Sequence, residues 1–147
     1  MKTGLVLLLC YLMVAASAGW ETDFEKAKQL AEKEHKLILL NFSGSDWCGP
    51  CIRMHDEIFE NEAFKSYSKD HLVLLNADFP RLKKNQLSRE QQKHNDALAD
   101  RYNAKGIFPL TVLLTTDGNV LKVWEGHPGI RADEFVSQLK TVNNAGR

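Results

Sequence analysis

The stretch that decides the fold is LILLNFSGSDWCGPC, which runs from Leu37 to Cys51. Its first part, Leu37 to Phe42, is an apolar run too short for a typical helix, so we expect a strand covered on both faces. Two cysteines follow, two residues apart, where a helix is expected to begin. Thiols at this spacing can close a small disulfide ring, so the stretch indicates a redox dithiol.

Cys48 is expected to be the attacking sulfur of this pair. The amide groups and the dipole of the helix that begins here stabilise a thiolate on the first cysteine. Gly49 allows a tight backbone turn, and Pro50, with its fixed backbone angle and missing N–H, suits the first helical turn. Cys51 then faces back toward Cys48.

A zinc site and an inert structural disulfide are the two alternatives for the pair. Zinc needs two further ligands, and the chain has no second cysteine pair. A disulfide across so few residues constrains the unfolded chain little, so it would be a weak staple. Redox chemistry is therefore the favoured interpretation.

The first 18 residues are interpreted as a cleaved export signal, which leaves residues 19–147 as the domain. Lys2 supplies a charged start, Leu5 to Val14 an apolar segment, and Ala16 to Ala18 a small-residue cleavage site. An uncleaved membrane anchor is the alternative, but the apolar run is shorter than the roughly 20 residues that span a bilayer.

Removal of this segment also removes Cys10. A lipoprotein with its lipid on Cys10 is not favoured, because Leu9 precedes it where a lipid-attachment signal would need a small residue. Only the two motif cysteines then remain. In exported proteins disulfides commonly serve as staples, so a single closely spaced pair points to redox work instead.

Size and charge limit the function classes further. The chain has 147 residues, enough for one ordinary domain, and 44% hydrophobic residues, which supports a packed core. Its 19 basic and 19 acidic residues balance, and removal of Lys2 with the signal leaves 18 against 19. This balance gives no reason to expect nucleic acid as a partner.

The remaining elements follow from periodicity and from turn and cap residues. Thr22 and Glu25 form a capping box for the first helix, and Asp117-Gly118 marks a hairpin turn. The expected helices are 22–35, 48–59 with an irregular or helical continuation over 61–67, 88–105 and a final one around 135–142; the expected strands are 37–42, 72–77, 110–115 and 120–124.

The segment from Asp78 to Leu87 is polar and interrupted by Pro80, and we expect an exposed loop. Arg81, Lys83 and Lys84 lie close together in it. Such a basic cluster either recruits an acidic partner or is a solvated surface, and the second interpretation is the commoner one.

The order of these elements and the sequence WCGPC at Trp47 to Cys51 resemble the thioredoxin fold. This implies an α/β domain with a central mixed β-sheet flanked by helices on both faces, and the resemblance covers nearly all of residues 19–147. It is closest to exported bacterial thioredoxin-like proteins with a Gly-Ser-Asp-Trp-Cys lead-in. We expect a monomer in the periplasm, or secreted.

The resemblance implies the chemistry. Cys48 attacks a substrate disulfide, a mixed disulfide forms, and Cys51 attacks Cys48 to release the reduced substrate. No cofactor is needed beyond this pair. The Gly-Pro dipeptide favours a reductase of protein disulfides, with a membrane-embedded disulfide reductase as the expected electron donor; an oxidase or isomerase of the same fold is the alternative.

The resemblance also supplies a second site element, Phe108-Pro109. In this family a cis proline at the start of the third core strand lies against the dithiol, and the residue before it offers backbone hydrogen bonds to an extended substrate. Proline permits this isomer, and a trans proline that merely begins a strand is the alternative. Trp47, Gly49 and Pro50 are expected to complete the substrate surface.

Three residues depart from the family pattern. Asn41 and Leu74 stand where many thioredoxins have a buried Asp and a nearby Lys, and losing both charges together is physically coherent. Asn41 can only hydrogen-bond, so Cys51 must lose its proton to water or to Asp46. The alternative role for Asp46 is a purely structural one, loop capping. Leu110 replaces the usual threonine after the proline and predicts a more apolar groove edge.

Two functions of other classes remain open. Met54 and His55 follow the cysteines on the same helix, and together these four residues are plausible copper ligands. A copper-handling module is thus one alternative, although helix-face Met and His residues more often pack or face solvent. The other is a peptide-binding module that uses the groove around Trp47 and Phe108 without needing the dithiol.

Overall fold

The computed structural model describes residues 19–145, so the predicted signal segment lies outside the described residues. Four strands form one mixed sheet in the order β2-β1-β3-β4. β1 and β2 are parallel, whereas β3 is antiparallel to both β1 and β4. The strands are β1 (Leu37–Ser43), β2 (Leu72–Asp78), β3 (Leu110–Leu114) and β4 (Val120–Glu125).

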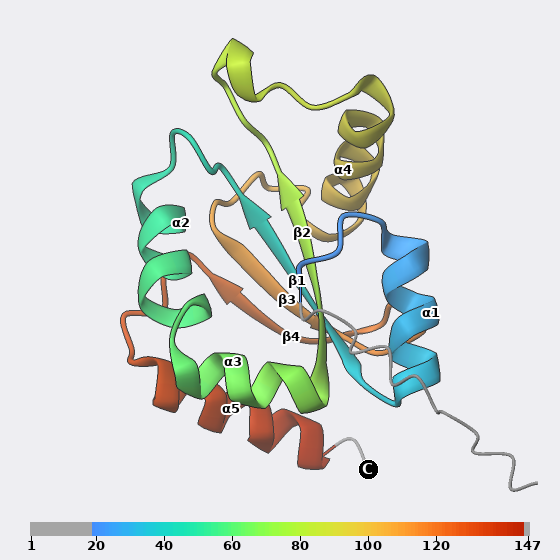
Figure 1. Ribbon diagram of the computed structural model, residues 1–147, viewed down its shortest axis with the longest axis vertical. Helices are drawn as coiled ribbons and strands as arrows, with labels where there is room; N and C mark the ends of the chain where they lie inside the picture. Colours follow the sequence, from blue (N-terminus) through green and yellow to red (C-terminus); the bar gives the residue numbers. More distant parts are fainter. Residues whose placement is uncertain (1–18, 146–147) are drawn as a thin grey trace, which may run out of the picture.

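Helices cover both faces of this sheet, as the sequence predicts (Figure 1). One face carries α1 (Phe24–Glu34) and α4 (Arg89–Tyr102). The other carries α2 (Gly49–Met54), the π-helix η1 (His55–Phe59), α3 (Glu62–His71) and α5 (Ala132–Ala145). No helix within residues 19–145 is long and apolar enough to cross a bilayer.

The alternation of side chains along β1 divides the core in two. Ile38, Leu40 and Phe42 pack with α1 and α4, whereas Leu39 packs with the residues of α2, η1, α3 and α5. Because successive strand residues point to opposite faces, Asn41 lies on the face of Leu39, under α2. This parity places a polar residue beneath the helix that carries the cysteines.

Two details of the helices differ from expectation. The N-cap of α1 is Asp23, whose carboxylate accepts the N–H of Lys26 at 2.8 Å, rather than Thr22. The helix predicted over 48–59 changes at His55 into the π-helix η1, whose wider turn places Ile58 and Phe59 together in the core. Asn61 then caps α3, so the helical alternative for 61–67 is confirmed.

The predicted hairpin at Asp117-Gly118 is confirmed. Gly118 has a φ of 83°, a backbone conformation that favours glycine. Its carbonyl accepts a hydrogen bond from the hydroxyl of Tyr102 at 2.7 Å. The last residues of α4 are thereby joined to the turn between β3 and β4.

Candidate functional site

The two motif cysteines meet at the N-terminus of α2. After β1 ends at Ser43, a tight turn forms in which the N–H of Cys48 donates to the carbonyl of Gly44 at 2.9 Å. Cys48 is the N-cap of α2, and its sulfur accepts the N–H of Cys51 at 3.2 Å. Cys48 and Cys51 form a disulfide with a Cα–Cα distance of 5.2 Å, and both are buried.

The indole of Trp47 is held in place from three directions. Its Nε1 donates to the carbonyl of Phe79 at 2.7 Å, and its ring meets that of Phe108 edge to face at 5.5 Å. The guanidinium of Arg81 lies 3.7 Å from the ring centroid, in cation–π geometry. Gly44 approaches so closely that a Cβ there would lie 2.3 Å from the indole. Trp47 therefore has one well-defined position beside Cys48.

The Phe108-Pro109 peptide bond is cis, the isomer that the family resemblance implies. Phe108 also packs edge to face against Phe79 at 5.4 Å, and the carbonyl of Pro109 accepts the N–H of Gly126 at 2.8 Å. Leu110 does not form a groove edge as predicted. It is buried in the core under α1 and α4, because its side chain follows the inward parity of Phe42, its partner on β1.

A row of uncharged polar side chains crosses the sheet under α2. Asn41 donates to the amide oxygen of Asn76 at 3.4 Å and accepts the hydroxyl of Thr111 at 3.2 Å. These three residues are in register on β2, β1 and β3. Leu74 pairs with Leu39 instead, so the cross-strand partner of Asn41 is Asn76. Asn76 and Thr111 were not identified from the sequence. The signal for them was alternation along the neighbouring strands, which places both side chains on the same face of the sheet as Asn41.

A pocket of about 420 Å³ reaches the second cysteine from the side of this polar row. Besides Cys51, its walls include Asn41 and Asn76 from the sheet and Ile52 and His55 from the helices. The remaining lining residues are Trp20, Ser43, Ser45 and Phe59. The pocket is large enough for several water molecules and has the polar partners that water requires.

Asp46 is bound to the loop that follows β2. Its carboxylate accepts the N–H groups of Arg81 and Leu82 at 2.9 and 3.0 Å and the side-chain amide of Asn85 at 3.0 Å. The bond from Arg81, together with those from Asn85 and Leu82, lowers the pKa of Asp46 below its usual value. This arrangement fits the loop-capping alternative and makes Asp46 a poor proton acceptor.

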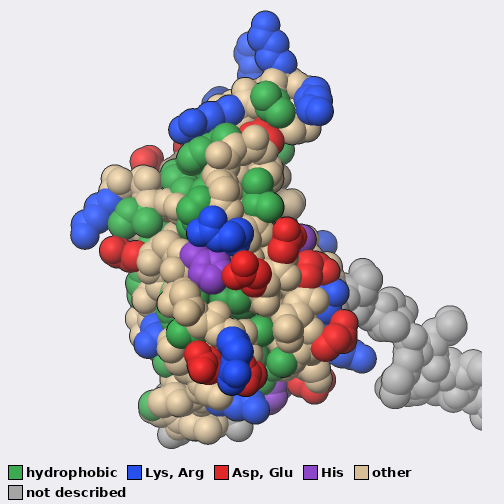
Figure 2. All heavy atoms as spheres, turned by 90° about the vertical axis from the view of Figure 1, so that its left-hand side faces the viewer, with side chains coloured by type: hydrophobic (Ala, Val, Ile, Leu, Met, Phe, Trp, Pro, Cys, Tyr) green, Lys and Arg blue, Asp and Glu red, His purple; other side chains and the backbone are tan. Residues whose placement is uncertain are grey.

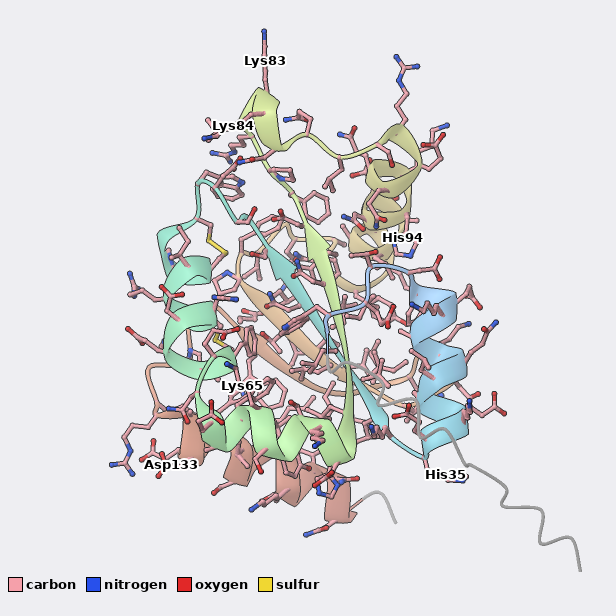
Figure 3. The ribbon with its side chains drawn as sticks, in the orientation of Figure 1. His35, Lys65, Lys83, Lys84, His94 and Asp133 are labelled. Carbon is pink, nitrogen blue, oxygen red and sulfur yellow. A yellow bond between two sulfur atoms is a disulfide. The ribbon has the colours of Figure 1, made fainter. Side chains whose placement is uncertain are left out.

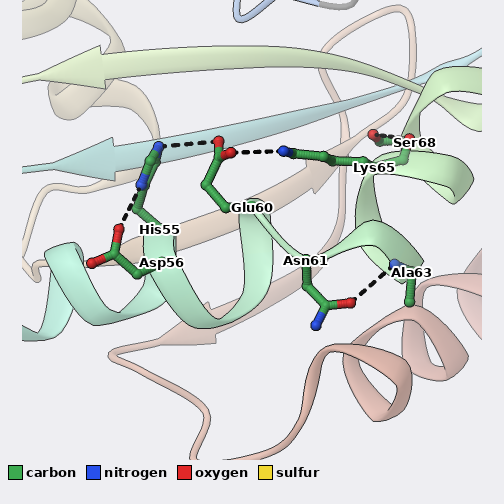
Figure 4. Close-up of polar contacts among 7 residues, drawn as sticks. All are labelled: His55, Asp56, Glu60, Asn61, Ala63, Lys65 and Ser68. Carbon is green, nitrogen blue, oxygen red and sulfur yellow. Dashed lines mark hydrogen bonds and ion pairs between the residues drawn. The ribbon is translucent and has the colours of Figure 1, made fainter.

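Of the four residues of the copper hypothesis, Cys48 and Cys51 are bonded to each other in the disulfide, and Cys51 and His55 line the same pocket. Met54 is fully buried in the core under α2, α3 and α5, whereas His55 is exposed. The imidazole of His55 lies 3.1 Å from the carboxylate of Asp56 and 3.4 Å from that of Glu60, which in turn pairs with Lys65 (Figure 4). Within the described part of the chain, no group of three or more His, Cys, Asp or Glu residues could hold a metal ion.

A cysteine pair at a helix start and a cis proline, placed by a mixed four-stranded sheet with helices on both faces, define the thioredoxin class of protein. The family of thioredoxin-like domains matches residues 24–143, and the chain belongs to this family. It is a thiol-disulfide oxidoreductase with a thioredoxin fold.

Individual relatives agree with this assignment. The disulfide bond reductase DsbH of Chlamydia pneumoniae is 36% identical over 130 residues, which cover 88% of this chain and 75% of that protein. A solved structure of a DsbH oxidoreductase is 34% identical, with a TM-score of 0.75 over 95% of this chain and 94% of that one. A thioredoxin from Thermus thermophilus, 19% identical with a TM-score of 0.59 over 82% of this chain and 83% of its own, shares the fold.

Proposed function

We propose that this protein reduces disulfides in other proteins outside the cytoplasm. The observation that carries the proposal is the position of Cys48 as the N-cap of α2, where its sulfur accepts the N–H of Cys51. Backbone N–H groups at a helix start favour a thiolate, which is the attacking species in disulfide exchange. The similarity to a disulfide bond reductase supports the direction of the reaction.

In the proposed reaction the dithiol form of the protein meets a client disulfide. The thiolate of Cys48 attacks one client sulfur, the client S–S bond breaks, and the departing sulfur takes up a proton. Cys51 then loses its proton and attacks the sulfur of Cys48, which releases the second client sulfur as a thiol. Two electrons pass from the dithiol to the client, and the Cys48–Cys51 disulfide seen here is the product form.

The client would bind beside Trp47, Gly49 and Pro50 and along the backbone at Phe108 and Pro109. Gly49 and Pro50 are exposed, and the ring of Phe108 packs against the indole of Trp47. We infer that Trp47 shields the sulfurs from solvent while its outer edge contacts the client. The packing of this indole from three directions supports a preorganised surface.

The proton of Cys51 is proposed to leave through water in the adjacent pocket. Asn41 can orient such a water, but an amide does not accept a proton at neutral pH. Cys51 lines this pocket, together with the polar groups of Asn41, Asn76 and Ser43. This route needs neither a carboxylate at position 41 nor Asp46.

The proposal extends to location and partners. We infer that residues 1–18 direct export and are removed, which would leave residues 19–147 as a monomeric domain in the periplasm or outside the cell. Such a reductase must receive electrons from another protein, for which a membrane-embedded disulfide reductase is the proposed donor. No cofactor is required, since the dithiol itself carries the electrons.

The decisive experiment is a redox titration of the Cys48–Cys51 pair together with turnover of a protein disulfide such as insulin. We expect a reduction potential near that of thioredoxin, about −270 mV. A potential close to the roughly −120 mV of the strong oxidants of this fold would overturn the assignment as a reductase.

Cysteine variants separate the remaining alternatives. Cys48→Ser should abolish turnover, and Cys51→Ser should accumulate the mixed disulfide with the client. If Cys48→Ser kept the biological activity, a peptide-binding module would replace the proposed enzyme. Tight Cu(I) binding that Met54→Ala or His55→Ala weakens would instead favour copper handling.

A further inference from the structure

The segment between β2 and α4 forms a strongly basic projection, here called the basic loop and defined as residues 79–88. From Phe79 to Arg89 the chain has four basic residues and no acidic one. Basic side chains gather at the projecting end of the molecule in the space-filling view (Figure 2). Lys83 and Lys84 stand at the tip of this loop, which has a short 3₁₀ turn over Lys83–Asn85 (Figure 3).

The basic loop is tied to the residues that precede the dithiol. The carboxylate of Asp46, two residues before Cys48, accepts two backbone N–H groups of the loop and the amide of Asn85. Within the loop, the amide of Gln86 donates to the carbonyl of Pro80 at 3.3 Å. The loop is therefore held in a defined position relative to the active-site helix.

The cations of the loop divide into two roles. Arg81 lies over the ring of Trp47, so its charge is placed against the residue that directly precedes Cys48. Lys83 and Lys84 are exposed, and neither takes part in any of the ion pairs found within residues 19–145. Two positive charges without an ion-pair partner among the described residues thus stand at the tip of a loop whose base is bonded to Asp46, two residues before Cys48.

We propose that the basic loop selects client proteins whose cystine is flanked by an acidic segment. This inference rests on the proposed function and names the client chemistry for the same site. Positive charges at the rim of a binding surface attract acidic partners and raise the association rate, an effect that salt screens. The loop is anchored to Asp46 and Trp47. This favours a partner that contacts the loop and the dithiol at the same time over a separate anionic surface such as a membrane.

The test compares two synthetic peptides with the same cystine, one flanked by Asp and Glu and the other by Asn and Gln. At low ionic strength we expect kcat/KM for the acidic peptide to be about 10-fold higher, and the difference to shrink as salt is added. Lys83→Glu/Lys84→Glu should remove or reverse this preference. Equal rates for both peptides with the unmodified protein would overturn the proposal.

The control variant is Lys33→Glu/Lys69→Glu, which changes the net charge equally. Lys33 and Lys69 lie in the last turns of α1 and α3, far from the basic loop, and are exposed (Figure 1). This variant should keep the preference for the acidic peptide. If both double variants lost it equally, net charge rather than the loop would be responsible, and the proposal would be wrong.

Two further readouts separate this inference from the proposed function. Turnover of a small uncharged disulfide, hydroxyethyl disulfide, should be the same in all variants. If the unmodified protein did not reduce this compound, the proposed function itself would be refuted. Binding to vesicles that contain an anionic phospholipid is measured in parallel. If Lys83→Glu/Lys84→Glu abolished vesicle binding and left the peptide preference intact, the loop would be a membrane contact and the proposal would fail.

Discussion

The carboxylate of Asp46 accepts the backbone N–H of Arg81 at 2.9 Å, across 35 positions of the chain. This bond connects the turn that leads into the cysteine motif with the basic loop that follows β2. It also explains why Arg81 lies over Trp47, because the same contact fixes the backbone from which its side chain extends. Trp47 and the basic loop are thus held together by contacts of the same residue, Arg81.

Asp46→Ala should release this loop. We expect faster cleavage by trypsin after Arg81, Lys83 and Lys84 and a lower stability at pH 7. Because the pKa of Asp46 is lowered in the folded protein, its contribution is present above the usual value of 3.8 and is lost as the pH falls below it.

Urea denaturation at pH 7 and pH 3 checks this sign, since the difference between the variant and the unmodified protein should shrink at pH 3. Asp96→Ala, which removes an exposed carboxylate of α4, is the control and should leave the trypsin pattern unchanged. Identical cleavage of the Asp46→Ala protein and the unmodified protein would contradict the anchoring role.

Gly44→Ala should displace the indole of Trp47. A Cβ at this position would lie 2.3 Å from the ring, and overpacking of this kind costs about 1–3 kcal/mol. We expect altered tryptophan fluorescence and slower turnover of protein disulfides. Gly49→Ala is the matched control because a Cβ there meets nothing within 4 Å, so its fluorescence should not change.

Asn41→Asp should restore a carboxylate beside Cys51 at a cost in stability. The site is buried, so a charge there destabilises the fold by about 2–4 kcal/mol. Burial raises the pKa of such a carboxyl, and stability should therefore fall as the pH rises from 5 to 8.

In rapid-mixing experiments the mixed disulfide should resolve faster in this variant, because a base now lies in the pocket that Cys51 lines. Asn95→Asp places a carboxylate at another buried position, outside this pocket, and should destabilise without accelerating resolution. An unchanged resolution rate in Asn41→Asp would argue against proton loss through the pocket.

Tyr102→Phe should weaken the link between α4 and the β3–β4 turn. The lost hydrogen bond to the carbonyl of Gly118 is worth about 1 kcal/mol. Burial raises the pKa of Tyr102, so its contribution is present below pH 10 and is lost as the pH rises through the folded-state value.

Thermal unfolding between pH 8 and 11 measures this effect, and the alkaline loss should be smaller in Tyr102→Phe. The hydroxyl of Tyr67 has only a 3.4 Å contact with the amide of Asn143, so Tyr67→Phe serves as the control. A steeper alkaline loss in Tyr102→Phe than in the unmodified protein would show that the sign is wrong.

The local elements of this protein follow from its sequence alone. The apolar runs at Leu37 and Leu72, the turn at Asp117-Gly118 and the motif WCGPC predicted the mixed sheet, its hairpin and the dithiol at a helix start. Each of these signals depends on neighbouring residues, through side-chain periodicity, backbone angle or the spacing of two thiols. The family resemblance added the cis proline, which the structure has.

Other features depended on contacts between distant positions, and only the tertiary structure decided them. The sequence allowed Asp46 to serve either as a loop cap or as a proton acceptor, and the structure shows it accepting the backbone N–H groups of Arg81 and Leu82. The polar row through Asn41 and the burial of Leu110 likewise depend on strand register. The chain alone therefore determined which two cysteines form the disulfide, whereas the packing of remote segments decided what surrounds them, because a hydrogen bond across 35 residues leaves no local pattern.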